Sequence, residues 1–155
     1  MKDQILKQLL DITSKQLEQA KASYESALAH SRSDDMKSEG KYDTRAIEAG
    51  YLTSAKKQRM EQLERELLSL SKLSSSKCEK AILGALILLE CEDKKSWYYL
   101  SCACGGETLT IDSEKIHVIT TTSPIGKEVL GLEEGDSFEL ENSQGVREFE
   151  LIECR

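Results

Sequence analysis

Apolar residues recur every three to five positions through the first part of the chain, with polar residues between them. In residues 2–32 they fall at Ile5, Leu9, Ile12, Leu17, Ala20, Tyr24, Ala27 and Leu28. This spacing places them on one face of a helix and leaves Lys, Gln, Glu and Ser for the other face. A helix of about 30 residues is about 45 Å long, so we expect a partner helix along its length.

A second helical pattern covers residues 44–73. Its predicted apolar face consists of Ile47, Tyr51, Ala55, Met60, Leu63, Leu67 and Leu70. From Met60 onward the steps are those of a heptad. Gly50 costs about 1 kcal/mol relative to Ala inside a helix, and we interpret it as a point where two backbones approach closely. We predict an antiparallel coiled coil within one chain, while an intermolecular coiled coil is the alternative because heptads alone do not define the partner.

The segment between the two helical patterns is rich in carboxylates. Residues 33–43 contain Asp34, Asp35, Glu39 and Asp43. In an antiparallel hairpin this segment is the exposed tip, far from any core. A solvated turn explains such a charge run, and a tip that presents metal ligands or charge to a partner is the functional alternative.

The pattern changes after the Ser-rich residues 71–77. Predicted strands then cover residues 81–90, 96–101, 108–112, 115–122, 135–141 and 146–153. Between them, Ser123 can cap a short helix that has Pro124 in its first position and ends at Gly131. The predicted fold class is therefore α+β. An antiparallel helical hairpin occupies residues 1–74, and a small, mainly antiparallel sheet domain with one short helix occupies residues 78–155.

Charge also divides the chain near Lys77. Residues 1–77 hold 14 Lys and Arg against 12 Asp and Glu, whereas residues 78–155 hold 7 against 16, a net charge of −9. Phosphates would be repelled by the second half, which argues against nonspecific nucleic-acid binding there. Acidic surfaces of this kind meet basic protein surfaces or increase solubility.

The rest of the sequence argues against a membrane-spanning protein, a disulfide-stabilised protein, a zinc protein and a hydrolase with a catalytic triad. The longest apolar run, residues 81–89, is too short to span a membrane and is interpreted as core. The five cysteines lack the spacing of a disulfide framework and fit a reducing cytoplasm. Cys102 and Cys104 have no second ligand pair for zinc, and neither His30 nor His117 has an obvious nucleophile to activate. We expect a cytoplasmic monomer.

Two motifs resemble one known family. Thr122-Ser-Pro-Ile-Gly-Lys-Glu-Val-Leu-Gly131, followed by Glu134-Gly-Asp136, resembles the C-terminal signature of the bacterial Gre transcript-cleavage factors. That signature reads S-P-[LIM]-[GA]-[KR]-x-L-[LI]-G, with G-D a few residues later. The tip is similar to the family pattern D-L-x-E-N-x-x-Y, in which Asp35 and Tyr42 take the Asp and Tyr positions.

The resemblance implies a fold and a function. Family members join an N-terminal coiled coil to an FKBP-like C-terminal domain, and they bind RNA polymerase in its secondary channel. It implies that Ser123, Pro124, Ile125 and Lys127 bind the polymerase. It also implies that the tip reaches the active centre, with possible contact to nascent RNA, and stimulates cleavage of backtracked RNA by the polymerase.

The tip carboxylates suit the chemistry that this function needs. Phosphodiester hydrolysis in a two-metal site uses two divalent cations and an activated water. Mg²⁺ prefers oxygen ligands and is often held by one or two carboxylates. On this hypothesis Asp35 and Glu39 help the polymerase to hold the second Mg²⁺, which the isolated protein does not bind stably.

The chain departs from the family at one position. The glutamate of the family pattern falls on Ser38, and Glu39 stands where Asn is usual. Asp35 and Glu39 are therefore four residues apart, where the family has three, and share a face only if this segment is helical. A regulator that occupies the channel without stimulating cleavage is the alternative function. A peptidyl-prolyl isomerase or chaperone is a third, but no aromatic-lined proline pocket is evident, and fold analogy alone is a weak basis for it.

Overall fold

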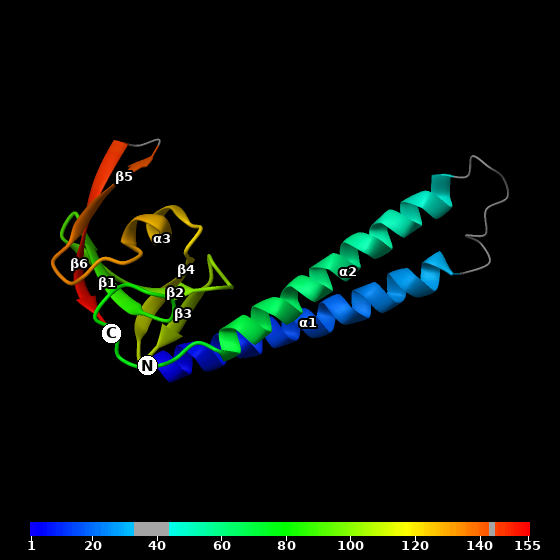
Figure 1. Cartoon of the computed structure of the whole chain (residues 1–155), viewed down its shortest axis with the longest axis horizontal. Helices are drawn as coiled ribbons and strands as arrows, with labels where there is room; N and C mark the ends of the chain where they lie inside the picture. The colour runs from blue at the N-terminus through cyan, green and yellow to red at the C-terminus, as the bar shows by residue number, and fades with distance from the viewer. Residues whose placement is uncertain (33–43, 143–144) are drawn as a thin grey trace. The chain divides into compact units, whose positions relative to one another are not determined.

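The structure is a computed structural model that describes residues 1–32, 44–142 and 145–155 (Figure 1). Its helices are α1 (Lys2–Ser31), α2 (Thr44–Ser71) and α3 (Pro124–Val129). Its strands are β1 (Leu86–Cys91), β2 (Lys94–Ser101), β3 (Thr108–Ile111), β4 (Glu114–Thr120), β5 (Ser137–Asn142) and β6 (Gly145–Cys154). The predicted fold, two long helices followed by a sheet with one short helix, is confirmed. None of the described helices is long and apolar enough to cross a membrane.

The chain forms two compact units. One consists of Met1–Leu10 together with Ser69–Arg155, and the other of Asp11–Leu68. We call the first the sheet unit and the second the hairpin unit. The start of α1 and the end of α2 thus belong to the sheet unit.

In the hairpin unit, α1 and α2 lie antiparallel. Lys21 Nζ of α1 lies 3.4 Å from Glu64 Oε1 of α2. Nearer the far end of the unit, Thr53 Oγ1 lies within 3.3 Å of the carbonyl oxygen of Ala27, to which it donates. The antiparallel pairing that the apolar patterns predicted is therefore present within one chain.

The predicted apolar face of α2 is correct only in its second half. Met60 and Leu67 are half-buried and Leu63 is buried, whereas Ile47 and Tyr51 are 57% and 74% exposed. The residues that turn inward over the whole helix are Ala46, Ala49, Thr53, Lys56, Met60, Leu63, Leu67 and Leu70. These positions alternate steps of three and four, so they form one unbroken heptad seam. The predicted face combined two different stripes of the helix: Ile47, Tyr51 and Ala55 lie on the exposed side, and the step of five residues from Ala55 to Met60 crosses to the inner seam.

Gly50 is not a point of close approach between the two helices. Gly50 is exposed, and a Cβ built on it would have no atom from outside its own helix turn within 4 Å. The interpretation of Gly50 as a close-approach point is therefore wrong, and Ala46 and Ala49 occupy the inner face instead. On α1 the fully buried Thr13 takes the place expected for Ile12, which is half-buried.

The sheet unit contains one six-stranded sheet with the order β3-β4-β2-β1-β6-β5. All neighbours are antiparallel except β2 and β4, which pair in parallel from Trp97↔Ile116 to Ser101↔Thr120. The crossover between them runs through β3, so the sheet is mainly but not wholly antiparallel. The core lies between this sheet and α3, and its buried members include Ile87, Leu89, Leu100, Val129, Phe149 and Leu151. Phe138 stacks on Phe149 with ring centroids 5.2 Å apart.

The strand predicted over residues 81–90 begins later, at Leu86. Gly84 has a φ of +87°, in the left-handed region that breaks an extended chain. Ala81 is nevertheless fully buried, and it exchanges two hydrogen bonds with the chain after α3. The Ala81 N–H donates to the Leu132 carbonyl at 2.8 Å, and the Gly131 N–H donates to the Ala81 carbonyl at 2.8 Å. The prediction that the apolar run is core is correct for Ala81 and for residues 85–89, whereas Ile82 and Leu83, in the turn, are exposed.

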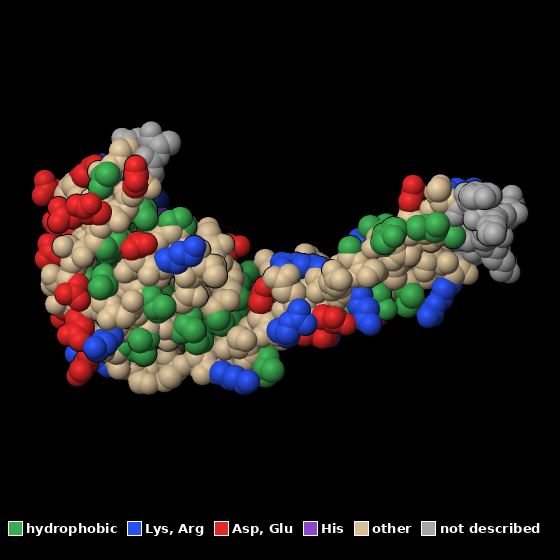
Figure 2. All heavy atoms as spheres, turned by 45° about the horizontal axis from the view of Figure 1, so that its top comes forward, with side chains coloured by type: hydrophobic (Ala, Val, Ile, Leu, Met, Phe, Trp, Pro, Cys, Tyr) green, Lys and Arg blue, Asp and Glu red, His purple; other side chains and the backbone are tan. Residues whose placement is uncertain are grey.

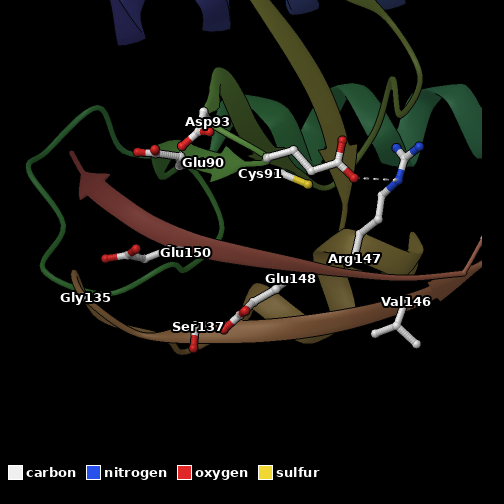
Figure 3. Close-up of a pocket in the computed structure, with 10 residues that line it drawn as sticks. Glu90, Cys91, Asp93, Gly135, Ser137, Val146, Arg147, Glu148 and Glu150 are labelled. Atoms are coloured by element: carbon white, nitrogen blue, oxygen red, sulfur yellow. Dashed lines mark ion pairs between the residues drawn. The ribbon is translucent and has the colours of Figure 1, made fainter.

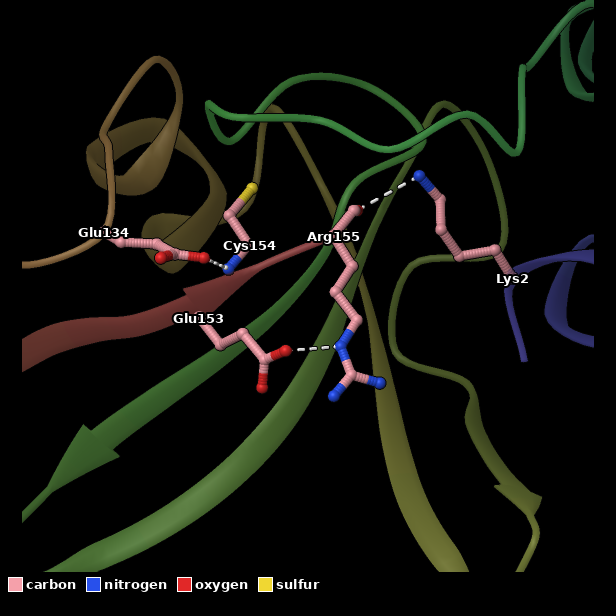
Figure 4. Close-up of polar contacts among 5 residues, drawn as sticks. All are labelled: Lys2, Glu134, Glu153, Cys154 and Arg155. Atoms are coloured by element: carbon pink, nitrogen blue, oxygen red, sulfur yellow. Dashed lines mark hydrogen bonds and ion pairs between the residues drawn. The ribbon is translucent and has the colours of Figure 1, made fainter.

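The start of α1 is hydrogen-bonded to Arg155, the residue that follows β6, within the same unit (Figure 4). Lys2 Nζ donates to the carbonyl oxygen of Arg155 at 3.1 Å and to that of Ser76. The Arg155 guanidinium lies 5.1 Å from the Trp97 ring centroid, a cation–π contact. The contact between Lys2 and Arg155 joins residues that are 153 positions apart in the sequence.

Candidate partner-binding site

The structure describes only one of the two predicted parts of the functional site. Asp35 and Glu39, with Ser38 between them, lie outside the described residues. The Ser123–Lys127 motif is fully described, at the start of α3. Within residues 1–32, 44–142 and 145–155, no three His, Cys, Asp or Glu side chains gather in a way that could hold a metal ion.

Ser123 and Gly126 shape the turn that precedes α3. Ser123 is the N-cap: its Oγ accepts from Gly126 N–H at 3.1 Å and donates to the Thr120 carbonyl at 2.7 Å. A Cβ on Gly126 would come 2.0 Å from that same carbonyl oxygen, so no larger residue fits without backbone movement. The residue types at Ser123 and Gly126 are therefore explained by the fold of this turn alone.

Pro124 and Lys127 instead face solvent. Both are exposed, and the Lys127 N–H closes the first helical bond to the Ser123 carbonyl at 3.0 Å. Pro124 stands in the first helical position, where its fixed φ suits the helix and its missing N–H costs nothing. The turn thus exposes a rigid apolar ring and a cation to solvent, while Ile125 is half-buried and contacts the core.

The second motif fragment, Glu134-Gly-Asp136, also builds a turn. An Asp136 carboxylate oxygen accepts from Glu133 N–H at 2.8 Å, and Gly135 adopts a φ of +92°. A Glu134 carboxylate oxygen accepts from Cys154 N–H at 2.9 Å (Figure 4). This fragment therefore anchors the chain before β5 to the end of β6.

A cavity of about 430 Å³ opens beside Ile125. Its apolar wall consists of Leu89, Tyr98, Ile125, Leu140 and Phe149. Burial raises the pKa of the Tyr98 hydroxyl, which keeps the ring neutral. No aromatic-lined proline pocket is evident from the sequence. Tyr98 and Phe149 reach this cavity from strands that are not adjacent, so no local pattern brings them together.

A second cavity, of about 500 Å³, has a different chemistry (Figure 3). Five carboxylates contribute to its wall: Glu90, Glu92, Asp93, Glu148 and Glu150. Cys91, Glu92 and Arg147 line both cavities, and Arg147 Nε lies 3.9 Å from Glu92 Oε1. The acidic character predicted for residues 78–155 is visible as a concentration of Asp and Glu side chains over this unit in Figure 2.

Comparison with known proteins finds similarity only among solved structures. No protein-family model and no curated protein matches the chain. A structure described as GreA factor homolog 1 (Gfh1) of Thermus thermophilus is 23% identical, with 98% of this chain and 93% of that chain covered and a TM-score of 0.38. Thermus aquaticus Gfh1 is 24% identical, with 94% and 92% covered and a TM-score of 0.40. A prokaryotic transcription elongation factor GreA/GreB from Nitrosomonas europaea is 16% identical, with 74% and 94% covered and a TM-score of 0.37.

The chain is thus similar in structure to Gfh1 and GreA/GreB transcription elongation factors. The identities lie between 16% and 24% and the TM-scores between 0.37 and 0.40. A similarity at this level does not establish a shared function. The function of this protein is therefore inferred from its sequence motifs and from the geometry of the α3 turn.

Proposed function

We propose that this protein is a transcription factor that binds RNA polymerase in its secondary channel. The observation that carries the proposal is the Ser123–Gly131 motif. Its Ser and Gly build a rigid turn, and its Pro and Lys stand exposed on that turn. A pre-formed surface of this kind loses little conformational freedom when it binds.

In this proposal the sheet unit docks on the polymerase, and the hairpin carries residues 33–43 to the active centre. The protein acts as a monomer, in the cytoplasm, and is a cofactor of the polymerase rather than an enzyme. Contact of the tip with nascent RNA belongs to the same proposal.

We infer that the tip stimulates cleavage of backtracked RNA through Asp35 and Glu39. Carboxylate oxygens match the ligand preference of Mg²⁺, and these two residues would hold the ion together with the polymerase. Bound there, the ion would supply the second metal of a two-metal phosphodiester hydrolysis. Ser38 offers only a neutral hydroxyl, so a channel regulator with little or no cleavage activity is the alternative function.

Binding to purified core RNA polymerase tests the proposal. Labelled full-length protein should bind saturably, and an established secondary-channel ligand should displace it. Cleavage of RNA in backtracked complexes then separates the two functions. Absence of saturable binding would overturn the proposal as a whole. Isomerisation of proline peptides would instead favour the third class, the isomerase or chaperone, to which the Tyr98 and Phe149 wall of the cavity beside Ile125 corresponds.

A further inference from the structure

Two of the cysteines, Cys78 and Cys154, line one small cavity of the sheet unit. The cavity has a volume of about 230 Å³, and its wall consists of Lys77, Cys78, Glu79, Glu133, Glu134 and Cys154. The structure describes all the cysteines of the chain, and Cys91, Cys102 and Cys104 do not line this cavity. A water molecule takes up about 30 Å³ in the liquid, so a small oxidant has room beside both thiols.

Pairing between distant segments brings Cys78 and Cys154 to this cavity. Lys80 forms an antiparallel bridge with Glu133, so the residues just before Lys80 run beside Glu134. A Glu134 carboxylate oxygen accepts from Cys154 N–H at 2.9 Å. Cys78 also packs against the hydrophobic core cluster to which Cys154 belongs. The two cysteines therefore lie beside the same glutamate and the same part of the core, although the sequence separates them widely.

The two thiols have different surroundings. Cys78 is half-buried, and the Lys2 ammonium lies 3.6 Å from its sulfur. A cation beside a cysteine sulfur favours its reaction as a nucleophile. Cys154 is buried, and burial, followed by the charge of Cys78, raises the pKa of its thiol to about 11. Cys154 therefore keeps its proton at neutral pH, and Cys78 is the thiol that meets an oxidant first.

The charges in the wall restrict the kind of oxidant. Glu79, Glu133 and Glu134 contribute carboxylates, and Lys77 contributes an ammonium. Glu133 Oε1 lies 2.8 Å from Lys80 Nζ in an exposed ion pair. Negative charge is in excess among the residues that line the cavity, and it opposes the approach of an anionic oxidant but not of a neutral one. A neutral hydroperoxide is small enough and carries no charge.

We propose that Cys78 and Cys154 are a thiol pair that a neutral hydroperoxide converts to a disulfide, with Cys78 as the attacking thiol and Cys154 as the resolving thiol. A disulfide requires Cβ atoms about 3.5–4.5 Å apart. Cys78 lies between α2 and β1, outside any helix or strand, so the backbone there can adjust to that distance. Disulfides of reducing compartments are mostly transient, catalytic or redox-sensing, and this pair is of that kind. The proposal is independent of polymerase binding.

The hydroperoxide is the complete oxidant for this reaction. The Cys78 sulfur attacks one peroxide oxygen, so that an S–O bond forms and the O–O bond breaks. The alkoxide or hydroxide that leaves takes up the proton of the Cys78 thiol. The Cys154 sulfur then attacks the sulfenic acid on Cys78: an S–S bond forms, the S–O bond breaks, and the leaving hydroxide takes the Cys154 proton to become water. Two thiols are oxidised to one disulfide, and the hydroperoxide is reduced to an alcohol or water, with one further water released.

The test treats reduced full-length protein with hydrogen peroxide near neutral pH. An alkylating reagent added under denaturing conditions stops the reaction, and mass spectrometry of the peptides identifies each disulfide. We expect a disulfide between Cys78 and Cys154, and we expect dithiothreitol to restore both thiols. No disulfide at Cys78, or a disulfide that joins Cys78 to another cysteine, would overturn the proposal.

Single variants assign the two roles. Cys154→Ala should leave Cys78 as a sulfenic acid, which dimedone traps. Cys78→Ala should leave Cys154 as an unmodified thiol under the same conditions. Cys91→Ala is the matched control, because Cys91 is also half-buried but does not line this cavity, and it should form the disulfide at the wild-type rate. Labelling of Cys154 by dimedone in Cys78→Ala, or its absence from Cys78 in Cys154→Ala, would contradict the assignment.

A charge variant tests the contribution of Lys2. Lys2→Gln keeps a hydrogen-bond donor beside Cys78 but removes the positive charge, and should slow disulfide formation at least about threefold. Lys115→Gln removes an exposed charge from β4 and should oxidise as wild type does. If Lys2 served only to hold the segment around Cys78 in place, its loss would expose the thiol and speed the reaction. An unchanged or faster reaction in Lys2→Gln would therefore overturn the role of Lys2.

Discussion

Gly126 lies directly against the carbonyl oxygen of Thr120, where a Cβ would come within 2.0 Å of that oxygen. The same carbonyl accepts the hydrogen bond of the Ser123 hydroxyl at 2.7 Å. One backbone group of β4 thus holds both the cap and the first turn of α3. The close approach requires glycine for reasons of space, independently of any partner.

Replacement of Gly126 by Ala should therefore destabilise the sheet unit strongly. A buried clash with backbone cannot be relieved by a side-chain rotation, and overpacking of this kind costs about 3 kcal/mol. Urea denaturation of the full chain, followed by Trp97 fluorescence, measures the change. A loss below about 0.5 kcal/mol, the range of ordinary surface substitutions, would show that the turn can move aside.

Gly50 should respond in the opposite direction. It lies inside α2, and a Cβ on it would meet no atom from outside its own helix turn within 4 Å. Gly50→Ala should stabilise the helix by about 1 kcal/mol, because Gly is the poorer helix former. Thermal unfolding monitored by helical circular dichroism tests this, with Ala49→Leu on the inner face as the contrasting, destabilising change. A lower stability for Gly50→Ala would restore the close-approach interpretation.

The exposed residues of the α3 turn should contribute to polymerase affinity without contributing to stability. Pro124→Ala with Lys127→Ala should weaken binding at least tenfold, about 1.4 kcal/mol. Glu128→Ala, at another exposed position of α3, is the matched control and should bind as wild type does. Ser123 is a poor choice for this test, since loss of its cap costs about 1 kcal/mol of stability. Unchanged affinity in the double variant would remove this surface from the proposed function.

The tip prediction concerns residues outside the described part of the chain. Asp35→Asn should abolish cleavage stimulation and preserve polymerase affinity, because it removes a charge from the Mg²⁺ ligand but keeps its shape. Ser38→Glu should increase cleavage if the displaced carboxylate limits activity. RNA shortening in stalled complexes, measured across a Mg²⁺ titration, decides both. If neither wild type nor Ser38→Glu shortens the RNA, the regulator function replaces cleavage; if Asp35→Asn behaves as an active wild type, the tip assignment is wrong.

Alkaline pH should destabilise the sheet unit through two buried groups. Burial raises the pKa of the Cys154 thiol from 9.0 to about 11 and that of the Tyr99 hydroxyl from 10.0 to about 12. The folded pKa exceeds the unfolded one in both, so their stabilising effect is complete below about pH 9 and is lost as pH rises through each folded pKa. Urea midpoints at about pH 8 and about pH 10 should differ more for wild type than for Cys154→Ala. An equal difference would exclude Cys154 as a source.

The sequence by itself determined the elements and the main local motif. Residues 2–32 and 44–73 have the length and periodicity of long helices, and no other regular structure accommodates such steps. Ser123, Pro124 and Gly131 define the start and end of α3 through their own hydrogen-bonding and backbone properties. These interactions act within a few residues, so they can be predicted without knowledge of the rest of the chain.

Tertiary structure decided which face of α2 turns inward and which residues line the cavity beside Ile125. Ile47 and Tyr51 make as good an apolar stripe as Ala46 and Ala49 on the helix alone, but the inner face opposite α1 accepts the small residues. The cavity beside Ile125 brings together Leu89, Ile125 and Phe149, which belong to three separate elements. Pairing and packing between distant segments determine such features, because the free energy of burial depends on the neighbour that covers a side chain and not on the side chain alone.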